Sequence, residues 1–132
     1  MRIAIPIWED KVSPVLDTAL RLLVVEVEYH REVSRFIYNI DEQDLIRRCL
    51  RIRNFNIDTL ICGAVSRPFV CILLASGVDV IQEISGRAEE VLKAYLHGNL
   101  FCSRFLMPGC RRNRFRPGDK YSPKIDKEEV IG

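Results

Sequence analysis

The chain contains two short apolar runs that each pass directly into small or polar residues, and this pairing limits the folds open to it. Residues 3–7 precede a loop at 8–14, and residues 59–62 precede a loop at 63–68. Apolar runs of this length, rich in branched side chains and bounded by Gly, Pro and Ser, are typical of buried parallel strands. Open α/β sheets bind ligands at the loops that leave the carboxyl ends of such strands. We therefore expect any binding site at these two loops.

Between the two runs, the sequence predicts a hairpin and then a helix. Residues 22–28 and 33–40 are rich in branched and aromatic side chains, and the polar link 29–32 suits an antiparallel turn. Asp41 can cap the following helix, which carries an apolar stripe and ends at Asn54.

After the second apolar run, the pattern alternates between helix, strand and helix. Ser66 is a suitable cap for a helix that ends at Gly77, residues 78–84 predict a third parallel strand, and a last helix opens at Ser85 and Gly86. Parallel strands that are joined by helices need right-handed crossovers, so the helices should cover both faces of one mixed sheet. The prediction is an α/β fold, a three-layer α/β/α sandwich around a mostly parallel five-stranded sheet.

Charge and composition predict a domain boundary near Asn99. A chain of 132 residues is long enough for one domain with a substantial core. Residues 101–132 contain eight basic and four acidic residues, a net charge of +4, which leaves 12 basic and 14 acidic residues, a net charge of −2, in residues 1–100. We expect a core domain at 1–100 and a basic carboxyl-terminal tail at 101–132 that is extended or partly disordered.

Apolar runs and cysteines argue against several classes of protein. No apolar run approaches the roughly 20 residues that cross a bilayer, and the amino terminus lacks a signal-peptide pattern, so a cytoplasmic protein is expected. The five cysteines are an odd number without a Cys-x-x-Cys pair, which argues against a disulfide framework and a standard structural zinc site. Reduced thiols are expected, with Cys49 and Cys71 packed among apolar neighbours on their helices.

Three segments resemble the dinitrogenase iron-molybdenum cofactor biosynthesis family: MRIAIPIW at 1–8, VSPVLDTA at 12–19 and LICGAVSRP at 60–68, with a further likeness at 105–110. The family includes NifX, NafY, the carboxyl-terminal part of NifB and the orange protein, which holds a molybdenum–copper sulfide cluster. The resemblance implies a ribonuclease H-like fold and a carrier, not an enzyme, for an iron-molybdenum or other metal–sulfur cluster. A cluster donor or acceptor protein would be its partner. Neither His30 nor His97 is spaced to bind metal, which departs from relatives that use histidine at the cluster.

Residues at the predicted site suit such an anionic cargo. The helices that start at Ser66 and Gly86 would point their amino ends, with unpaired N–H groups, toward the mouth of the first loop. Arg67 adds a permanent positive charge, and Cys62 could supply a thiolate whose pKa the cation and the helix end would lower. Asp17 is expected to cap a short turn within the first loop. The expected contact residues are Trp8, Ser13, Cys62, Gly63, Ala64, Ser66, Arg67, Ser85 and Gly86.

Metal ligation is predicted for cysteines. Cys110 is flanked by arginines outside the predicted core, where packing does not explain a thiol and its pKa would be lowered. Cys102 is a weaker companion, and Cys62 is the third candidate. Alternatively, Cys62 is a small packing residue at a strand end, and Trp8 is a half-buried hydrophobic residue instead of a pocket wall.

Two other functions stay open. Residues 104–116 interleave arginines with Phe105 and Phe115, a pattern that can bind single-stranded nucleic acid or a partner protein. A divalent-metal nuclease would need several converging carboxylates about 4 Å from paired ions. The acids available for it do not include a mid-strand aspartate in the core: they are Glu9, Asp10, Asp17 and Asp58. The chain is expected to be a monomer or a homodimer, because an exposed edge strand in the hairpin would permit pairing.

Overall fold

The computed structural model describes residues 1–98, 100, 105 and 114–115. The elements follow in the order β1 (Arg2–Trp8), β2 (Lys11–Val12), the 3-10 helix η1 (Leu16–Thr18), β3 (Arg21–Glu28), β4 (Arg31–Asn39), α1 (Leu45–Asn54), β5 (Thr59–Ile61), α2 (Arg67–Ala75), β6 (Asp79–Ile81), α3 (Ala88–Leu96) and β7 (Arg114–Phe115). The predicted α/β class and the predicted order of the main elements are confirmed. Within these residues, no helix is long and apolar enough to cross a membrane.

A single sheet has the strand order β4-β3-β1-β5-β6-β7, and β2 pairs with β1. β1 is parallel to β5, and β5 is parallel to β6, whereas β3 is antiparallel to both β1 and β4. Of the five predicted strands, β3 alone therefore runs against the other four. β2 and β7 are two-residue additions that the sequence analysis did not predict.

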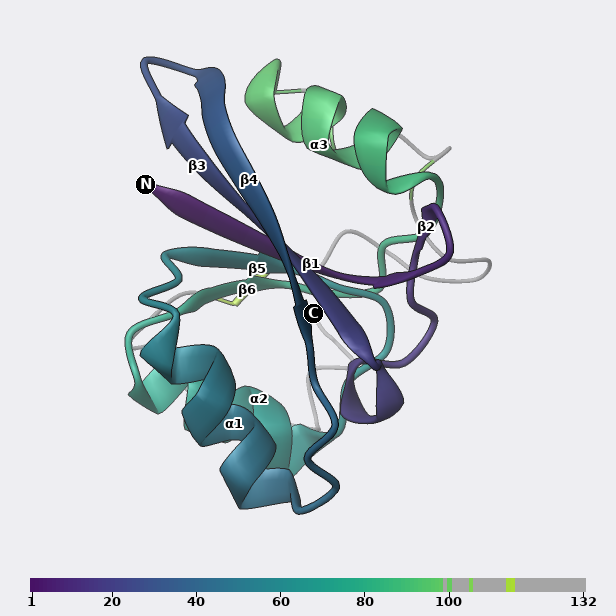
Figure 1. Cartoon of the computed structure of the whole chain (residues 1–132), viewed down its shortest axis with the longest axis vertical. Coiled ribbons are helices and arrows are strands. Elements are labelled where there is room, and N and C mark those ends of the chain that lie inside the picture. The colour runs from purple at the N-terminus through teal and green to yellow at the C-terminus, as the bar shows by residue number, and fades with distance from the viewer. Residues whose placement is uncertain (99, 101–104, 106–113, 116–132) are drawn as a thin grey trace, which may run out of the picture.

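The helices cover both faces of this sheet (Figure 1). α1 and α2 pack on one face, where Ile52 and Phe69 are fully buried against Leu60. α3 packs on the other face, where Val91 is fully buried against Ile5. Successive strand side chains point to opposite faces of a sheet, so each central strand contributes to both apolar clusters.

The β3–β4 hairpin has a shorter turn and longer strands than the sequence predicted. Tyr29 and His30 both have positive φ, 53° and 64°, as a two-residue type I′ turn requires. Arg31 and Glu32, which were expected in the link, belong to β4 and pair with β3. The register shifts at Glu26 of β3, where β4 has one extra residue.

Two helices begin later than predicted, and one strand is shorter. Asp44 caps α1 instead of Asp41, since its carboxylate accepts a hydrogen bond of 3.1 Å from the Arg47 N–H. α3 begins at Ala88 instead of Ser85, because Gly86 has a φ of +125°, which a right-handed helix excludes. β6 spans only the first part of the predicted strand 78–84.

Buried contacts of the domain continue beyond residue 98. Leu100 and Phe105 belong to the apolar cluster under α3, with exposed fractions of 2% and 5%. β7 pairs with β6 at the far side of the sheet. Phe105 is therefore a core residue and not an exposed stacking ring. Most of the predicted tail 101–132 lies outside the described residues.

Candidate functional site

Three segments that are distant in sequence meet at the edge where β1, β5 and β6 end, which we call the carboxyl edge. The Leu16 N–H donates to the Ala64 carbonyl and the Ala64 N–H donates to the Pro14 carbonyl, both at 2.8 Å. The Val12 N–H donates to the Gly86 carbonyl at 2.9 Å. Backbone hydrogen bonds thus join the segment after β1 to the loops after β5 and β6.

Gly63 permits the closest of these contacts. A Cβ atom at this position would lie 2.6 Å from the Pro14 carbonyl oxygen and 2.7 Å from the Ser13 carbonyl oxygen. Both oxygens belong to the backbone, so they cannot move aside as a flexible side chain would. The first two segments can touch here only because residue 63 has no side chain.

A carboxylate already lies at the amino end of α2. Asp17 accepts a hydrogen bond of 2.8 Å from the Ser66 N–H, so it stabilises a distant segment instead of the local turn for which it was predicted. Ser66 precedes α2 as expected, but its hydroxyl makes no capping hydrogen bond. Among the described residues, this buried hydroxyl has no partner at all. Asp17 therefore places negative charge where the predicted site requires positive potential.

A buried arginine holds the same segment from its other side. Arg48 of α1 is 4% exposed and donates to the carbonyl oxygens of Leu16 at 3.2 Å, Ala19 at 2.5 Å and Glu42 at 2.8 Å. Burial lowers the pKa of Arg48, while the charge of Asp17 opposes that shift. Arg48 is one of four arginines in α1 and was not among the residues predicted for the site.

The cysteines differ from the predictions. Cys62 is fully buried at the end of β5, and its pKa is raised by burial first and by neighbouring carboxylates second. The expected lowering of its pKa is therefore wrong. Burial also raises the pKa of Cys49 to about 11, whereas Cys71 is exposed and not packed as expected. Cys102 and Cys110 lie outside the described residues.

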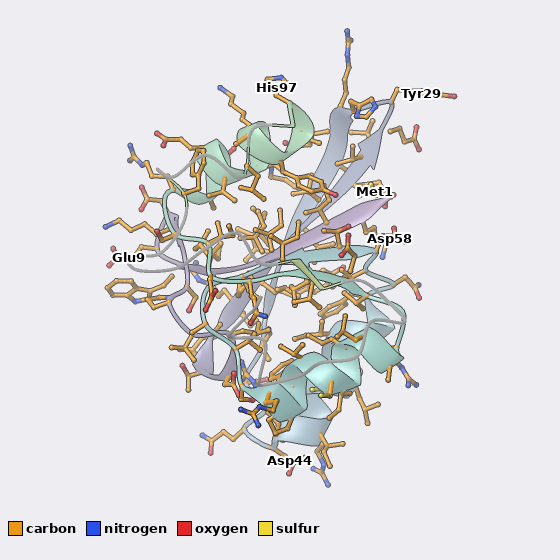
Figure 2. All side chains as sticks on the ribbon, turned by 180° about the vertical axis from the view of Figure 1, so that it is seen from behind. Met1, Glu9, Tyr29, Asp44, Asp58 and His97 are labelled. Atoms are coloured by element: carbon orange, nitrogen blue, oxygen red, sulfur yellow. The ribbon has the colours of Figure 1, made fainter. Side chains whose placement is uncertain are left out.

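Carboxylates do not gather at one place in the described part of the chain. No group of three His, Cys, Asp or Glu side chains there could hold a metal ion. Glu9 and Asp58 lie at opposite ends of the sheet (Figure 2), and Asp10 forms an exposed ion pair of 2.9 Å with Arg87. The arrangement gives no support to a two-metal nuclease within these residues.

Trp8 and Ser13 line a hollow of about 540 Å³ beside the segment after β1. Trp8 is 58% exposed, and Val15 and Leu20 of the same lining are 39% and 69% exposed. Trp8 is thus an exposed wall and not a half-buried residue. The other predicted contact residues do not line this hollow: Cys62, Gly63, Ala64, Ser66, Arg67, Ser85 and Gly86. Those residues lie in the two neighbouring loops and at the start of α2, where Ala64, Arg67 and Gly86 are exposed.

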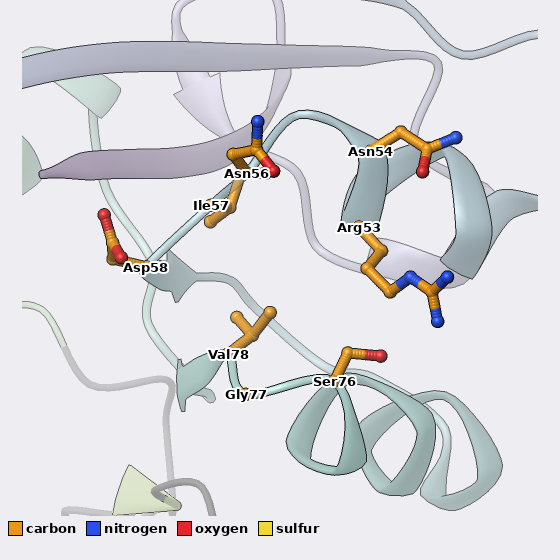
Figure 3. A pocket seen from close by; sticks show the side chains of 8 residues that line it. All are labelled: Arg53, Asn54, Asn56, Ile57, Asp58, Ser76, Gly77 and Val78. Atoms are coloured by element: carbon orange, nitrogen blue, oxygen red, sulfur yellow. The ribbon is translucent and has the colours of Figure 1, made fainter.

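A second hollow, of about 650 Å³, lies at the opposite, amino edge of β5 and β6. Its lining includes the ends of α1 and α2 and the turns that precede the two strands. The polar ends of Arg53, Asn54, Asn56 and Asp58 point in different directions (Figure 3). They therefore do not converge on a single ligand.

Comparison with known proteins gives one family and one fold. The family described as dinitrogenase iron-molybdenum cofactor matches residues 1–98. The crystal structure of PH0822 is 20% identical with a TM-score of 0.71, and the match covers 74% of this chain and 90% of that chain. The apo form of the orange protein from Desulfovibrio gigas is 19% identical with a TM-score of 0.63, over 85% of this chain and 95% of that chain. At these identities the likeness shows a shared fold. No curated protein was found to be similar to this chain.

Proposed function

Because this chain belongs to the dinitrogenase iron-molybdenum cofactor family, we propose that it is an accessory protein that carries an anionic metal–sulfur cluster and does not transform it. The carrying surface is the carboxyl edge. The observation that supports this surface is the set of backbone hydrogen bonds between three distant segments, all within the matched residues. Segments fixed to one another in this way offer a bulky cargo a preorganised surface, which reduces the entropy lost on binding.

Positive charge for the cargo would come from Lys11, Arg67 and Arg87, which are all exposed at this edge. The Asp10–Arg87 ion pair is exposed, and such pairs contribute little to stability, so a multiply charged anion can compete with Asp10 for Arg87. Asp17 holds the Ser66 N–H. The cargo is therefore expected against the outer side of Arg67 and Arg87, away from the first N–H groups of α2.

Thiolate ligands for the cluster are proposed to be Cys110 and its companion Cys102. Cys62 would remain a neutral, packed thiol, because burial raises its pKa. This role fits a cytoplasmic protein whose partner is a cluster donor or acceptor protein. Trp8 and Ser13, at the neighbouring hollow, would contact that cargo or that partner.

Tetrathiomolybdate, a small anionic molybdenum sulfide, can test this proposal. The full chain is purified without oxygen, incubated with the probe, passed through gel filtration, and assayed for molybdenum per chain and for its visible spectrum. Arg67→Ala is expected to reduce the retained molybdenum about tenfold, a factor that corresponds to one lost charge-assisted contact. Cys110→Ser is expected to reduce it at least as much, because a thiolate ligand of the metal is lost.

Matched controls are available on α1 and α2. Arg53→Ala removes an exposed arginine at the amino edge, and Cys71→Ser removes an exposed thiol. Both are expected to retain as much molybdenum as the unchanged chain. Equal retention by all four variants would refute the proposed surface and its ligands.

A further inference from the structure

We propose that two copies of this chain pair through the outer edge of β4 and form one continuous sheet. β4 is the end strand of the sheet, opposite β7, and lies in front of the other strands in Figure 1. Eight of its nine residues are exposed, and Tyr38 is partly buried. This inference does not depend on the proposed cargo.

One hydrogen bond shows which backbone groups of β4 point away from the sheet. The Ile40 N–H donates to the Leu20 carbonyl at 2.6 Å, so Ile40 directs its backbone groups toward β3. In an antiparallel ladder this direction alternates with each residue. The N–H and C=O groups of Arg35, Ile37 and Asn39 therefore point away from β3. A row of such groups is a template for another strand.

The sequence of this edge is complementary to itself when the pairing is centred on Ile37. In that antiparallel register Ile37 faces Ile37 of the second copy, Phe36 faces Tyr38, and Arg35 faces Asn39. Phe36 and Ile37, which are 49% and 55% exposed, would both be covered. A register centred on Arg35 would instead set Phe36 opposite Ser34 and Tyr38 opposite Glu32, so it would lose both aromatic cross-strand pairs.

Aromatic rings reinforce this register on the α1 face of the sheet. The ring of Tyr38 stacks on Phe55, with centroids 4.2 Å apart and an interplanar angle of 21°. Phe36 lies 6.2 Å from Tyr38. Pairing would set Phe36 of each copy opposite Tyr38 of the other, so the two three-ring rows would become one aromatic cluster across the interface. Aromatic cross-strand pairs are among the favourable ones.

Charge on the opposite face does not oppose the pairing. Arg35 forms ion pairs with Glu32 and with Glu89 of α3, so its charge is compensated within its own chain. The regular part of β4 is short, and pairing through it would bury less than the about 1,600 Å² of a standard interface. We therefore expect a reversible dimer with a dissociation constant on the order of 10 μM.

Sedimentation of the full chain in reducing buffer, from about 1 to about 500 μM, brackets this constant. A dimer that dissociates on dilution is expected. Ile37→Lys places two ammonium groups opposite each other and should weaken the dimer at least about tenfold. Ile46→Lys alters an isoleucine of α1 that is 60% exposed and should leave the dimer unchanged.

Two further variants separate pairing from folding. Ile37→Pro removes an outward N–H that no β3 carbonyl accepts, and proline is tolerated at such edge positions, so it should abolish the dimer while circular dichroism stays unchanged. On mild oxidation Ile37→Cys should yield a disulfide-linked dimer, whereas Ile46→Cys should not. If the other Ile37 variants fail to fold, this crosslinking result alone decides whether β4 pairs with a second copy. A monomer throughout the concentration range, or a dimer that none of the Ile37 substitutions affects, would overturn the proposal.

Discussion

The two ends of the parallel strands are built differently. At the carboxyl edge, the segment after β1 exchanges backbone hydrogen bonds with the loops after β5 and β6. At the amino edge, the Asp58 carboxylate accepts from the Arg2 N–H at 2.8 Å and the Asp58 backbone carbonyl accepts from the Asp79 N–H at 2.9 Å. Both bonds join only strands that already pair with each other. The hollow at the amino edge is the larger of the two described, yet its polar side chains diverge (Figure 3).

This difference shows that a hollow lined with polar side chains is not necessarily a preorganised binding surface. Polar side chains at the amino edge are mostly exposed and point in different directions (Figure 3), as is common for residues in loops. At the carboxyl edge, Arg48 and Asp17, which are buried and half-buried, fix the positions of the loops. The exposed side chains of Lys11, Arg67 and Arg87 lie on this fixed framework. The carboxyl edge is therefore the better candidate for recognition of a bulky cargo, although its hollow is smaller.

Gly63→Ala should have the largest effect, because its new Cβ would meet two backbone oxygens. We expect a loss of about 3 kcal/mol in the free energy of unfolding, measured by urea denaturation. Gly77→Ala at the amino edge meets no atom within 4 Å and bears only the strain of a φ of +91°, which costs about 1 kcal/mol. Equal losses at the two glycines would contradict the contrast between the two edges.

Arg48→Met should have the next largest effect. The substitution removes the donor of the Ala19 and Glu42 carbonyl oxygens and one of the two donors of the Leu16 carbonyl oxygen. We expect a loss of about 2 kcal/mol in the free energy of unfolding. Hydrogen exchange at residues 16–20 should accelerate, because the segment loses its attachment to α1. Arg47→Met, on the exposed side of the same helix, should change stability by less than about 0.5 kcal/mol; the same exchange rates in both variants would argue against an anchoring role.

Asp17→Asn tests how the negative charge at the amino end of α2 affects binding of the anionic cargo. It keeps an acceptor for the Ser66 N–H but removes the negative charge, so we expect a loss of about 1 kcal/mol and tighter binding of tetrathiomolybdate. Asp44→Asn makes the same change at the cap of α1, away from the carboxyl edge, and should cost a similar amount without improved binding. Unchanged binding in Asp17→Asn would place the cargo elsewhere.

The pH dependence of stability tests the burial of Cys49. Burial raises the pKa of Cys49 from its ordinary value of 9.0 to about 11, so the folded chain binds this proton more tightly than the unfolded chain. The resulting stability is complete below pH 9.0 and is lost as the pH rises toward about 11. Urea midpoints measured across this range should fall less steeply in Cys49→Val than in the unchanged chain, and equal slopes would contradict this prediction.

Local patterns in the sequence predicted the elements better than the contacts between them. The apolar runs, the hairpin and the three helices follow from periodicity and turn residues, which act over a few positions. The choice between Asp41 and Asp44 as the cap of α1 did not follow from local patterns, since both are aspartates and the path of the preceding chain decides which one caps the helix. The long-range hydrogen bond that Asp17 accepts from the Ser66 N–H had no local signal in the sequence.

Arg48 is a case where a signal existed. It lies three residues after Leu45 and four before Ile52, on the stripe of α1 that faces the sheet. Its residue type suggested the exposed face, because arginine is rarely fully buried. For Arg48, its place on the apolar stripe is a better guide to burial than its residue type. An arginine in such a stripe predicts that several carbonyl oxygens lie close to its guanidinium group.

The place of Phe105 sets the minimum length of a useful truncation. Its ring packs against Gly86 and Val91, and its carbonyl accepts from the Ser85 N–H at 2.7 Å, although the family match ends at residue 98. A fragment cut at that match would leave an open slot beneath α3 and an unpaired amide beside it. Fragments meant to fold alone should therefore extend at least to residue 115, where β7 ends.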